Sequence, residues 1–151
     1  MDVDGTLTDG KIYMGTCGEL MKSFSVKDGH GIRLIHSKYD ITPVVITGRK
    51  SVIVQNRCEE LKINDLHQGV KDKVKIVSDY VKRLAPEIVS YIGDDTNDLE
   101  AIKFVKEHDG ITACPADAAD AVKCEVSYIC THNGGDGAVR EFIDYLITNN
   151  L

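Results

Sequence analysis

The sequence contains no long apolar run and no excess of basic residues. Its longest uncharged apolar stretch, around Ile41 to Thr47, is far shorter than the roughly 20 residues that a transmembrane helix needs. The first residues also show no basic segment followed by an apolar one, which is the pattern of a secretion signal. We therefore expect a cytoplasmic protein with no membrane partner.

Paired cysteines are missing as well. The five cysteines are odd in number and form no C-x-x-C motif, so neither a disulfide framework nor a zinc site is indicated. Reduced thiols agree with a cytoplasmic location. We expect each cysteine to be a small buried apolar residue.

Acidic residues outnumber basic ones. With 24 Asp and Glu against 18 Lys and Arg, the formal net charge is −6. Such a chain binds nucleic acid or an anionic membrane poorly, so we expect neither as a partner. It would also repel a phosphorylated substrate unless cations were placed locally, and a bound metal ion resolves that conflict.

Short β-rich runs alternate with longer segments of helical period, which is typical of an α/β protein with a parallel sheet. We expect one domain over residues 1–151, because no repeat or linker is visible. The predicted strands are Met1–Asp4, Pro43–Ile46, Asp65–His67, Val89–Ile92, Gly110–Ala113 and Val126–Cys130. The predicted helices are Asp28–Lys38 with Asp28 as N-cap, Ser51–Leu61, Asp72–Leu84, Asn97–Glu107, Asp117–Val122 and Gly137–Ile147.

Residues 11–26 interrupt this alternation. The apolar runs Ile12–Met14 and Leu20–Val26 flank a stretch with glycine at both ends, which predicts a β-hairpin with a four-residue turn. The hairpin follows the first strand, so it should project at the carboxyl edge of the sheet, where ligands bind. The first strand is short for a central one, and we expect that apolar residues preceding Met1 are missing from this chain.

Two acidic motifs follow predicted strands. Asp2 and Asp4 end the first strand, and two carboxylates this close need a cation or a proton between them. The run from Asp94 to Asp98 follows another strand and should reach the same edge, where Mg²⁺ suits oxygen ligands. An Asp-rich turn and a helix cap are the ordinary alternatives, but capping explains one residue of the run and not the others.

Two further motifs carry phosphate-binding groups. Thr47 and Gly48 at a strand end supply a hydroxyl and backbone N–H groups, and Lys71 and Lys73 lie at a helix start. Such groups bind a phosphoryl group, although a Thr-Gly turn and a surface lysine are common by themselves.

The order of these motifs, Asp-x-Asp, Thr, Lys and then the acidic run, resembles the haloacid dehalogenase superfamily over nearly the whole chain. The resemblance implies a Rossmann-like three-layer sandwich with a mostly parallel sheet. It also implies a Mg²⁺-dependent phosphatase in which Asp2 is the nucleophile and Asp4 the general acid and base. The residues implied to bind the phosphoryl group are Thr47, Gly48 and Lys73, with Lys71 as the rival to the catalytic lysine Lys73.

The same resemblance implies the metal ligands. They are Asp2, the backbone carbonyl of Asp4 and Asp94, while Asp95 and Asp98 would assist through water. The mechanism so implied passes through an aspartyl-phosphate.

Three sequence motifs strengthen the resemblance. They are Lys22-Ser23-Phe24 leading into Lys27-Asp28-Gly29-His30-Gly31-Ile32, then Cys114-Pro115-Ala116-Asp117-Ala118, and the stretch from Gly134 to Glu141. Together they are similar to the 3-deoxy-D-manno-octulosonate 8-phosphate phosphatase family. Members lack a cap domain, and only 42 residues lie between Asp4 and Thr47, which leaves room for the hairpin and one helix. The resemblance implies a sugar acid phosphate substrate, lipopolysaccharide biosynthesis and a homotetramer assembled through the hairpin.

Substrate recognition would involve two arginines. Arg49 directly follows Thr47-Gly48, and its guanidinium suits a substrate carboxylate, with a solvated helix-start arginine as the alternative. Arg57 lies about two helical turns further on and could line the same mouth.

The sequence is also compatible with three other functions. Members acting on nine-carbon keto-sugar 9-phosphates can carry Glu in place of Arg49, and some relatives are tetramerising domains attached to an acylneuraminate cytidylyltransferase. An inert domain need not keep the whole catalytic set, which favours the enzyme. A signalling receiver domain also binds Mg²⁺ with carboxylates, but it needs an acceptor Asp where this chain has Thr47.

Overall fold

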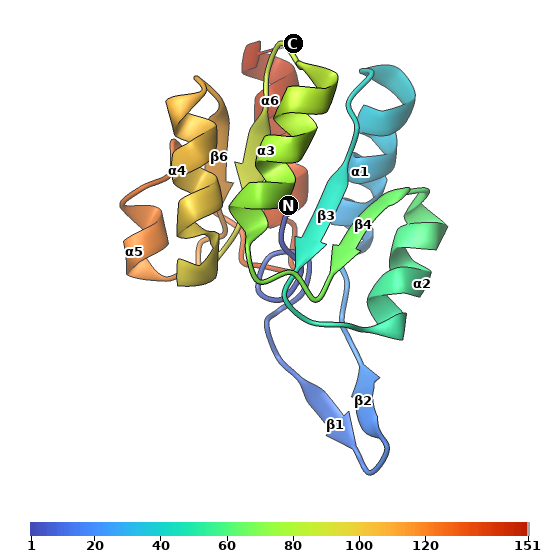
Figure 1. The fold of residues 1–151 in the computed structure, drawn as a ribbon. Helices are drawn as coiled ribbons and strands as arrows, with labels where there is room; N and C mark the ends of the chain where they lie inside the picture. Colours follow the sequence, from blue (N-terminus) through green and yellow to red (C-terminus); the bar gives the residue numbers. More distant parts are fainter. Residues whose placement is uncertain (151) are drawn as a thin grey trace.

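Parallel strands form the middle layer of the protein, with helices on both faces (Figure 1). The computed structural model describes residues 1–150. β3 (Val44–Thr47) pairs with β4 (Asp65–Gln68), and β5 (Ser90–Ile92) pairs with β6 (Ile111–Cys114), which pairs with β7 (Tyr128–Ile129). The helices are α1 (Val26–Lys38), α2 (Val52–Leu61), α3 (Lys73–Leu84), α4 (Leu99–Glu107), α5 (Asp120–Lys123) and α6 (Ala138–Asn150), with a 3₁₀ turn η1 (Thr96–Asp98) before α4.

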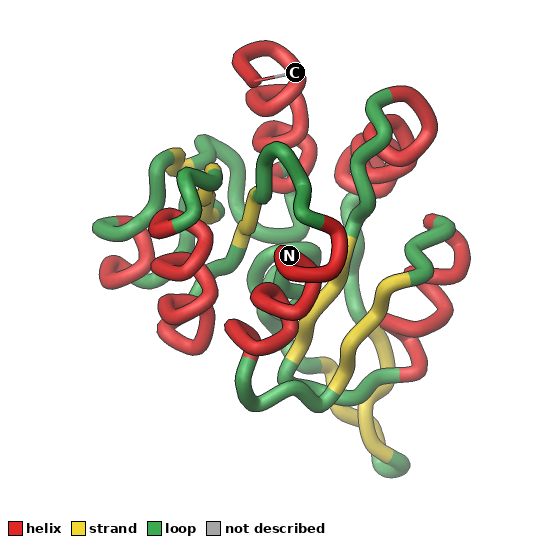
Figure 2. The backbone as a smooth tube through the Cα atoms, turned by 45° about the horizontal axis from the view of Figure 1, so that its top comes forward, coloured by secondary structure: helices red, strands yellow, loops and turns green. Residues whose placement is uncertain are grey.

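Met1 and Asp2 connect the two groups of strands. The Met1 nitrogen donates to Val44 O at 2.8 Å, and Met1 O accepts from Ile46 N at 2.9 Å. On the other side, Asp2 N donates to Ile92 O at 3.0 Å. The sheet is therefore continuous through these two residues, which lie near the centre of the molecule (Figure 2).

The predicted strand Met1–Asp4 is wrong in extent. The chain turns at Val3, whose carbonyl accepts hydrogen bonds from the amides of Thr6, Leu7 and Thr8 at 3.2, 2.9 and 3.0 Å. Strand-like pairing stops after Asp2 because this tight turn takes the backbone out of the sheet. Asp4 consequently lies in the turn and not in an extended strand.

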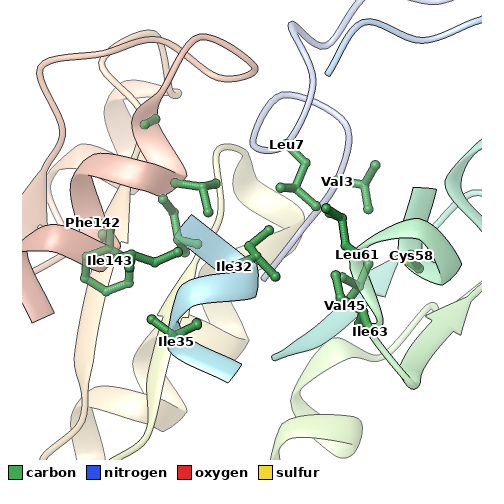
Figure 3. Packing of buried hydrophobic residues seen from close by; sticks show 14 of the residues in the cluster. Val3, Leu7, Ile32, Ile35, Val45, Cys58, Leu61, Ile63, Phe142 and Ile143 are labelled. Atoms are coloured by element: carbon green, nitrogen blue, oxygen red, sulfur yellow. The ribbon is translucent and has the colours of Figure 1, made fainter. Parts of the chain in front are cut away.

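Side chains of the strands alternate between two hydrophobic clusters, as a sheet covered on both faces requires. Val45, Ile92 and Ala113 pack in the cluster formed with α1, α2 and α6. Their strand neighbours Ile46, Tyr91 and Cys114 pack in the cluster formed with α3, α4 and α5. Figure 3 shows the first cluster, with Ile32 of α1 between residues of α6 and α2. This arrangement confirms the predicted three-layer α/β fold.

Asp28 does not cap α1, contrary to the prediction. Ser25 is the N-cap, and its side chain accepts from Asp28 N at 3.4 Å. The Asp28 carboxylate, in a residue only 1% exposed, instead accepts from Gly137 N at 3.4 Å and Arg140 N at 2.8 Å. It therefore satisfies free amides at the start of α6 and ties that helix to α1.

The hairpin projects from the carboxyl edge of the sheet (Figure 1). β1 (Tyr13–Gly15) and β2 (Gly18–Met21) are antiparallel, as predicted. Gly15 pairs with Gly18, so the predicted four-residue turn is present, with Thr16 and Cys17 as its two-residue loop. Gly18 has φ of 114°, a left-handed value that glycine adopts readily. The second strand ends at Met21, not Val26, since Ser25 already caps α1.

Other elements differ from prediction mainly at their ends. Ser51 and Asp72, which the sequence gave as the first residues of two helices, are the N-caps of α2 and α3 and cap them with their side chains. Helix α5 is shorter than predicted and starts at Asp120, and β7 has only two residues. Within residues 1–150, no helix is both long and apolar enough to cross a membrane.

Candidate active site

Three carboxylates meet at the carboxyl edge of the sheet. Oxygen atoms of Asp2, Asp94 and Asp98 all lie within 4.8 Å of one another. Asp2 is one of the two residues whose backbone lies between β3 and β5 in the sheet. Asp94 and Asp98 follow β5 in the chain. The predicted convergence of loops at one sheet edge is thus what the structure shows for these residues. We call Asp2, Asp94 and Asp98 the carboxylate group.

Lys73 is the cation closest to the carboxylate group. Its Nζ lies 2.8 Å from Asp2 Oδ1 and 2.7 Å from Asp98 Oδ1, and its side chain is 3% exposed. Asp72 caps α3 and so places Lys73 in the first turn of that helix. Burial lowers the pKa of Lys73, but the two carboxylates outweigh burial and raise its pKa overall.

Asp98 fastens the site together and has few lone pairs left. Its Oδ1 also accepts from the Tyr91 hydroxyl at 2.6 Å, and its Oδ2 accepts from the amides of Asp94 and Asp95 at 3.2 and 3.4 Å. Asp98 therefore orients Lys73 and the acidic loop. Burial, and then the Asp98 charge, raise the pKa of Tyr91 well above its usual value, which keeps this hydroxyl a donor. Sequence reasoning missed Tyr91, because an aromatic residue in a buried strand carries no functional signal.

Asp95 lies outside the carboxylate group. Its side chain is exposed and accepts from Thr96 N at 2.7 Å, where it caps the 3₁₀ turn. The expectation that Asp95 assists a metal is not supported by these contacts. The ordinary alternative, helix capping, explains this residue.

Asp94 carries the clearest sign of unbalanced charge. Burial, followed by repulsion from Asp2 and Asp98, raises the pKa of Asp94 to about 7. Thr6 donates its hydroxyl to Asp94 Oδ1 at 3.0 Å. A Cβ on Gly5 would lie 2.0 Å from Asp94 Oδ2, so only glycine lets the two loops meet this closely. Three carboxylates against one lysine fit a divalent cation with oxygen ligands.

Asp4 is not part of the carboxylate group and instead contacts two cations. It pairs with Lys22 of the hairpin base, and its Oδ2 lies 3.9 Å from Arg49 Nε. Its carboxylate is therefore not placed as a metal ligand, which leaves its backbone carbonyl for the predicted metal contact. The sequence placed Lys22 in a motif shared with the family but gave it no role; a charged residue directly after an apolar strand was a usable signal.

Thr47, Gly48 and Arg49 leave the end of β3. Thr47 is 2% exposed, and its hydroxyl oxygen accepts from Arg49 N at 3.3 Å. The Arg49 side chain is 44% exposed and lies 3.9 Å from Glu19 Oε1 as well as near Asp4. The structure therefore brings Arg49 to the mouth of the site.

Arg57 is placed elsewhere. Its guanidinium lies 2.8 Å from Glu60 Oε2, donates to Ser25 O at 3.3 Å and lies 5.5 Å from the centre of the Phe24 ring. These contacts fasten α2 to the start of α1. They do not support the prediction that Arg57 lines the site mouth beside Arg49.

The glycine-rich segment before α6 closes over the Asp2–Asp4 loop. Gly135 N donates to Thr6 O at 3.0 Å, and a Cβ on Gly134 would lie 1.8 Å from Gly5 O. Glu141 holds this segment by accepting from the amides of Thr131 and His132 at 2.9 and 3.0 Å. Burial raises the pKa of Glu141, but these hydrogen bonds outweigh burial and lower its pKa to about 2.

Comparison with known proteins identifies the family. No protein-family model matches the chain. The 3-deoxy-D-manno-octulosonate 8-phosphate phosphatase KdsC of Escherichia coli K12 is 44% identical over 149 residues, which cover 97% of this chain and 77% of that protein. The chain belongs to this phosphatase family. Members of the octulosonate phosphatase family are phosphoric monoester hydrolases, so the predicted enzyme class is confirmed.

Solved structures agree with this assignment. The crystal structure of the octulosonate phosphatase of Yersinia pestis matches with a TM-score of 0.90 and 39% identity, over 97% of this chain and 78% of that one. The phosphatase of Moraxella catarrhalis matches with a TM-score of 0.89 and 35% identity, over 98% and 83% of the two chains. That protein was crystallised with a magnesium ion, a phosphate ion and KDO.

Proposed function

We propose that this chain is a Mg²⁺-dependent phosphatase that hydrolyses 3-deoxy-D-manno-octulosonate 8-phosphate through an aspartyl-phosphate on Asp2. The observation that carries the proposal is the buried pair of Asp2 and Lys73 beside the carboxylate group, in a chain of the octulosonate phosphatase family. The magnesium, phosphate and KDO of the Moraxella enzyme support the metal and the substrate class. We also propose that residues 1–151 act as one domain without a cap, with residues 11–26 as a flap.

The first half of the reaction uses Asp2 and Asp4. A carboxylate oxygen of Asp2 attacks phosphorus, the bond from phosphorus to the sugar oxygen breaks, and Asp4 gives a proton to that oxygen. Lys73 orients Asp2 through the 2.8 Å ion pair and offsets charge on the phosphoryl oxygens. Thr47 and the Gly48 amide would hold the same oxygens at the end of β3.

The second half returns the enzyme to its starting state. Asp4, now a carboxylate, takes a proton from water as the water oxygen attacks phosphorus, and the bond to Asp2 breaks to release phosphate. Asp2, the Asp4 carbonyl and Asp94 would hold Mg²⁺, which supplies positive charge that favours the ionised form of Asp2 and offsets charge on the phosphate. Arg49 at the mouth would pair with the substrate carboxylate.

Phosphate release from a panel of sugar acid phosphates tests the substrate. We expect the highest kcat/KM for the eight-carbon 8-phosphate. Preference for a nine-carbon 9-phosphate would replace the substrate but keep the mechanism. No release from any member of the panel, with Mg²⁺ present, would indicate a non-catalytic tetramerising domain.

Removal of the metal is expected to abolish activity. The carboxylate group holds more negative charge than Lys73 can balance, so Asp2 and a phosphate ester would repel each other without a cation. Phosphate release should stop in excess chelator and return with added Mg²⁺. We also expect Ca²⁺ to inhibit, since it takes more ligands at longer distances than Mg²⁺ does. Full activity in chelator would contradict the proposal.

We further propose that the hairpin assembles a homotetramer, which is the active form. Met14 and Leu20 on the hairpin are 63% and 68% exposed, and an exposed apolar strand pair invites association with another chain. Phe24, which the sequence grouped with these residues, packs against the core of its own chain and is a poor probe.

Leu20→Asp is expected to break the assembly and raise KM together, while the melting temperature of each subunit changes little. Light scattering gives the mass and steady-state kinetics give KM. Ile88→Asp is the control, because Ile88 is also exposed, at 46%, but lies before β5 at the other end of the sheet. A wild type that is monomeric and fully active would contradict the tetramer.

A further inference from the structure

Lys22, at the base of the hairpin, joins the hairpin to Asp4. The Lys22 side chain is 0% exposed, and its ammonium pairs with the carboxylate of Asp4 and lies 2.9 Å from Glu19 Oε1. Lysine is almost never buried unless it is paired, so these two carboxylates determine where Lys22 lies. The mechanism above gives Lys22 no role.

Glu19 contacts Lys22 on one side and connects it to the start of α2 on the other. Glu19 Oε2 accepts from the hydroxyl of Ser51, the N-cap of α2, and Ser51 N donates to Gln68 Oε1 at 2.6 Å. Burial opposes the charge on Glu19, but the hydrogen bond from Ser51 and then the contact with Lys22 outweigh it and lower the pKa of Glu19. The hairpin is thereby bound to the loop between β3 and α2, which follows Thr47 and carries Arg49.

The position of Asp4 depends on this arrangement. The Asp2–Asp4 loop could present the Asp4 carboxylate to the metal or to the leaving oxygen, and only the second orientation lets Asp4 donate a proton there. The Asp4 carboxylate pairs with Lys22 and Arg49, whereas the carboxylate group pairs with Lys73, and Lys22 makes the close contact with Asp4. An error of about 1 Å in such a group can lower a rate roughly 100-fold.

We propose that Lys22 is a positioning residue that holds Asp4 toward the leaving oxygen, and that Glu19 anchors Lys22 to the β3–α2 loop. The hairpin then contributes to catalysis within its own chain, separately from any part in assembly. This inference rests on the proposed role of Asp4 as general acid and base.

The test compares two leaving groups in the first turnover. A sugar alkoxide needs a proton to leave, whereas p-nitrophenolate leaves without one. For Lys22→Gln we expect the first turnover of the octulosonate 8-phosphate to slow about 100-fold. The burst of p-nitrophenolate from p-nitrophenyl phosphate should slow less than about threefold, with slow turnover afterwards. Lys22→Arg should restore most of the sugar phosphate rate.

Three further variants make the result decisive. In an Asp4→Asn background, Lys22→Gln should cause no additional loss, because the residue it positions is already gone. Glu19→Gln, which leaves the contact between Lys22 and Asp4 in place, should shift the leaving-group ratio in the same direction but less, and serves if Lys22→Gln fails to fold. Lys11→Gln, at a 72% exposed hairpin lysine, is the control and should match wild type.

Equal loss with both leaving groups, no loss with either, or additive loss in the Asp4→Asn background would each overturn the positioning role. A wild type that releases phosphate from neither compound would instead overturn the proposed function. The two failures are therefore distinguishable.

Discussion

Asp2→Asn is expected to lower kcat by at least about 10⁴-fold while the protein stays folded. An amide oxygen cannot form the aspartyl-phosphate. The other two carboxylates of the group have other roles: Asp98 accepts from Lys73, Tyr91 and two amides, and Asp94 is proposed to hold Mg²⁺. Initial rates of phosphate release with Mg²⁺ measure the loss.

The fold should tolerate this change. Burial, and then the charge of Asp98, raise the pKa of Asp2 despite the opposing effect of Lys73, so the folded protein disfavours the Asp2 charge. A neutral amide at this position is therefore not expected to lower the free energy of unfolding. Asp79→Asn, at an exposed position of α3, is the matched control for removing one carboxylate. Retention of more than about 1% of the wild-type rate would show that Asp2 is not the nucleophile.

Lys73→Met is expected to damage both activity and stability. The substitution leaves Asp2 and Asp98 buried without the cation that lies 2.8 and 2.7 Å from them. Breaking a buried ion pair by removing one partner costs about 3–5 kcal/mol in the free energy of unfolding. We also expect kcat to fall by about 10³-fold, because Asp2 loses its orientation and the phosphoryl oxygens lose a positive charge.

Urea unfolding of three proteins separates these effects. Lys73→Met should unfold at lower urea than wild type, and adding Asp98→Asn should recover part of the loss, since it removes one of the stranded charges while keeping an oxygen acceptor for the amides. Activity should not recover in the double variant. A single variant as stable as wild type would show that the charge of Lys73 does not balance the carboxylate group.

The strand-end motifs were predictable because their position depends on local pattern. A parallel sheet brings the carboxyl ends of its strands to one edge. Because Asp94 and Thr47 each come at the end of a predicted strand, their position at that edge could be predicted without knowing how the helices pack. The starts of α2 and α3 were also predicted to within one residue, because the capping residues Ser51 and Asp72 act within one turn of their own helices. The family resemblance added the roles, which the geometry alone does not assign.

Contacts between distant segments could not be read in this way. Asp28 is the third residue of α1 and looks like a cap, but its carboxylate accepts from two amides at the start of α6, those of Gly137 and Arg140, which lie 109 and 112 residues away. Arg57 has the right spacing from Arg49 to share a site, yet it contacts Phe24 instead. Asp4 pairs with Lys22, a residue 18 positions away in the chain that comes near Asp4 only in the folded hairpin. Tertiary packing determines these contacts, and a local sequence pattern carries no information about it.

The turn at Gly134 and Gly135, which closes over the loop of Asp4 and Thr6, has a consequence for protein synthesis. Gly135 follows Thr6 by 129 positions, so the Asp2–Asp4 loop is synthesised well before the segment that packs against it. Contacts between the two ends of a chain form only after the intervening elements have folded or collapsed. We therefore expect the nascent chain to remain without phosphatase activity until translation has passed Glu141, so that no half-made copy acts on substrate.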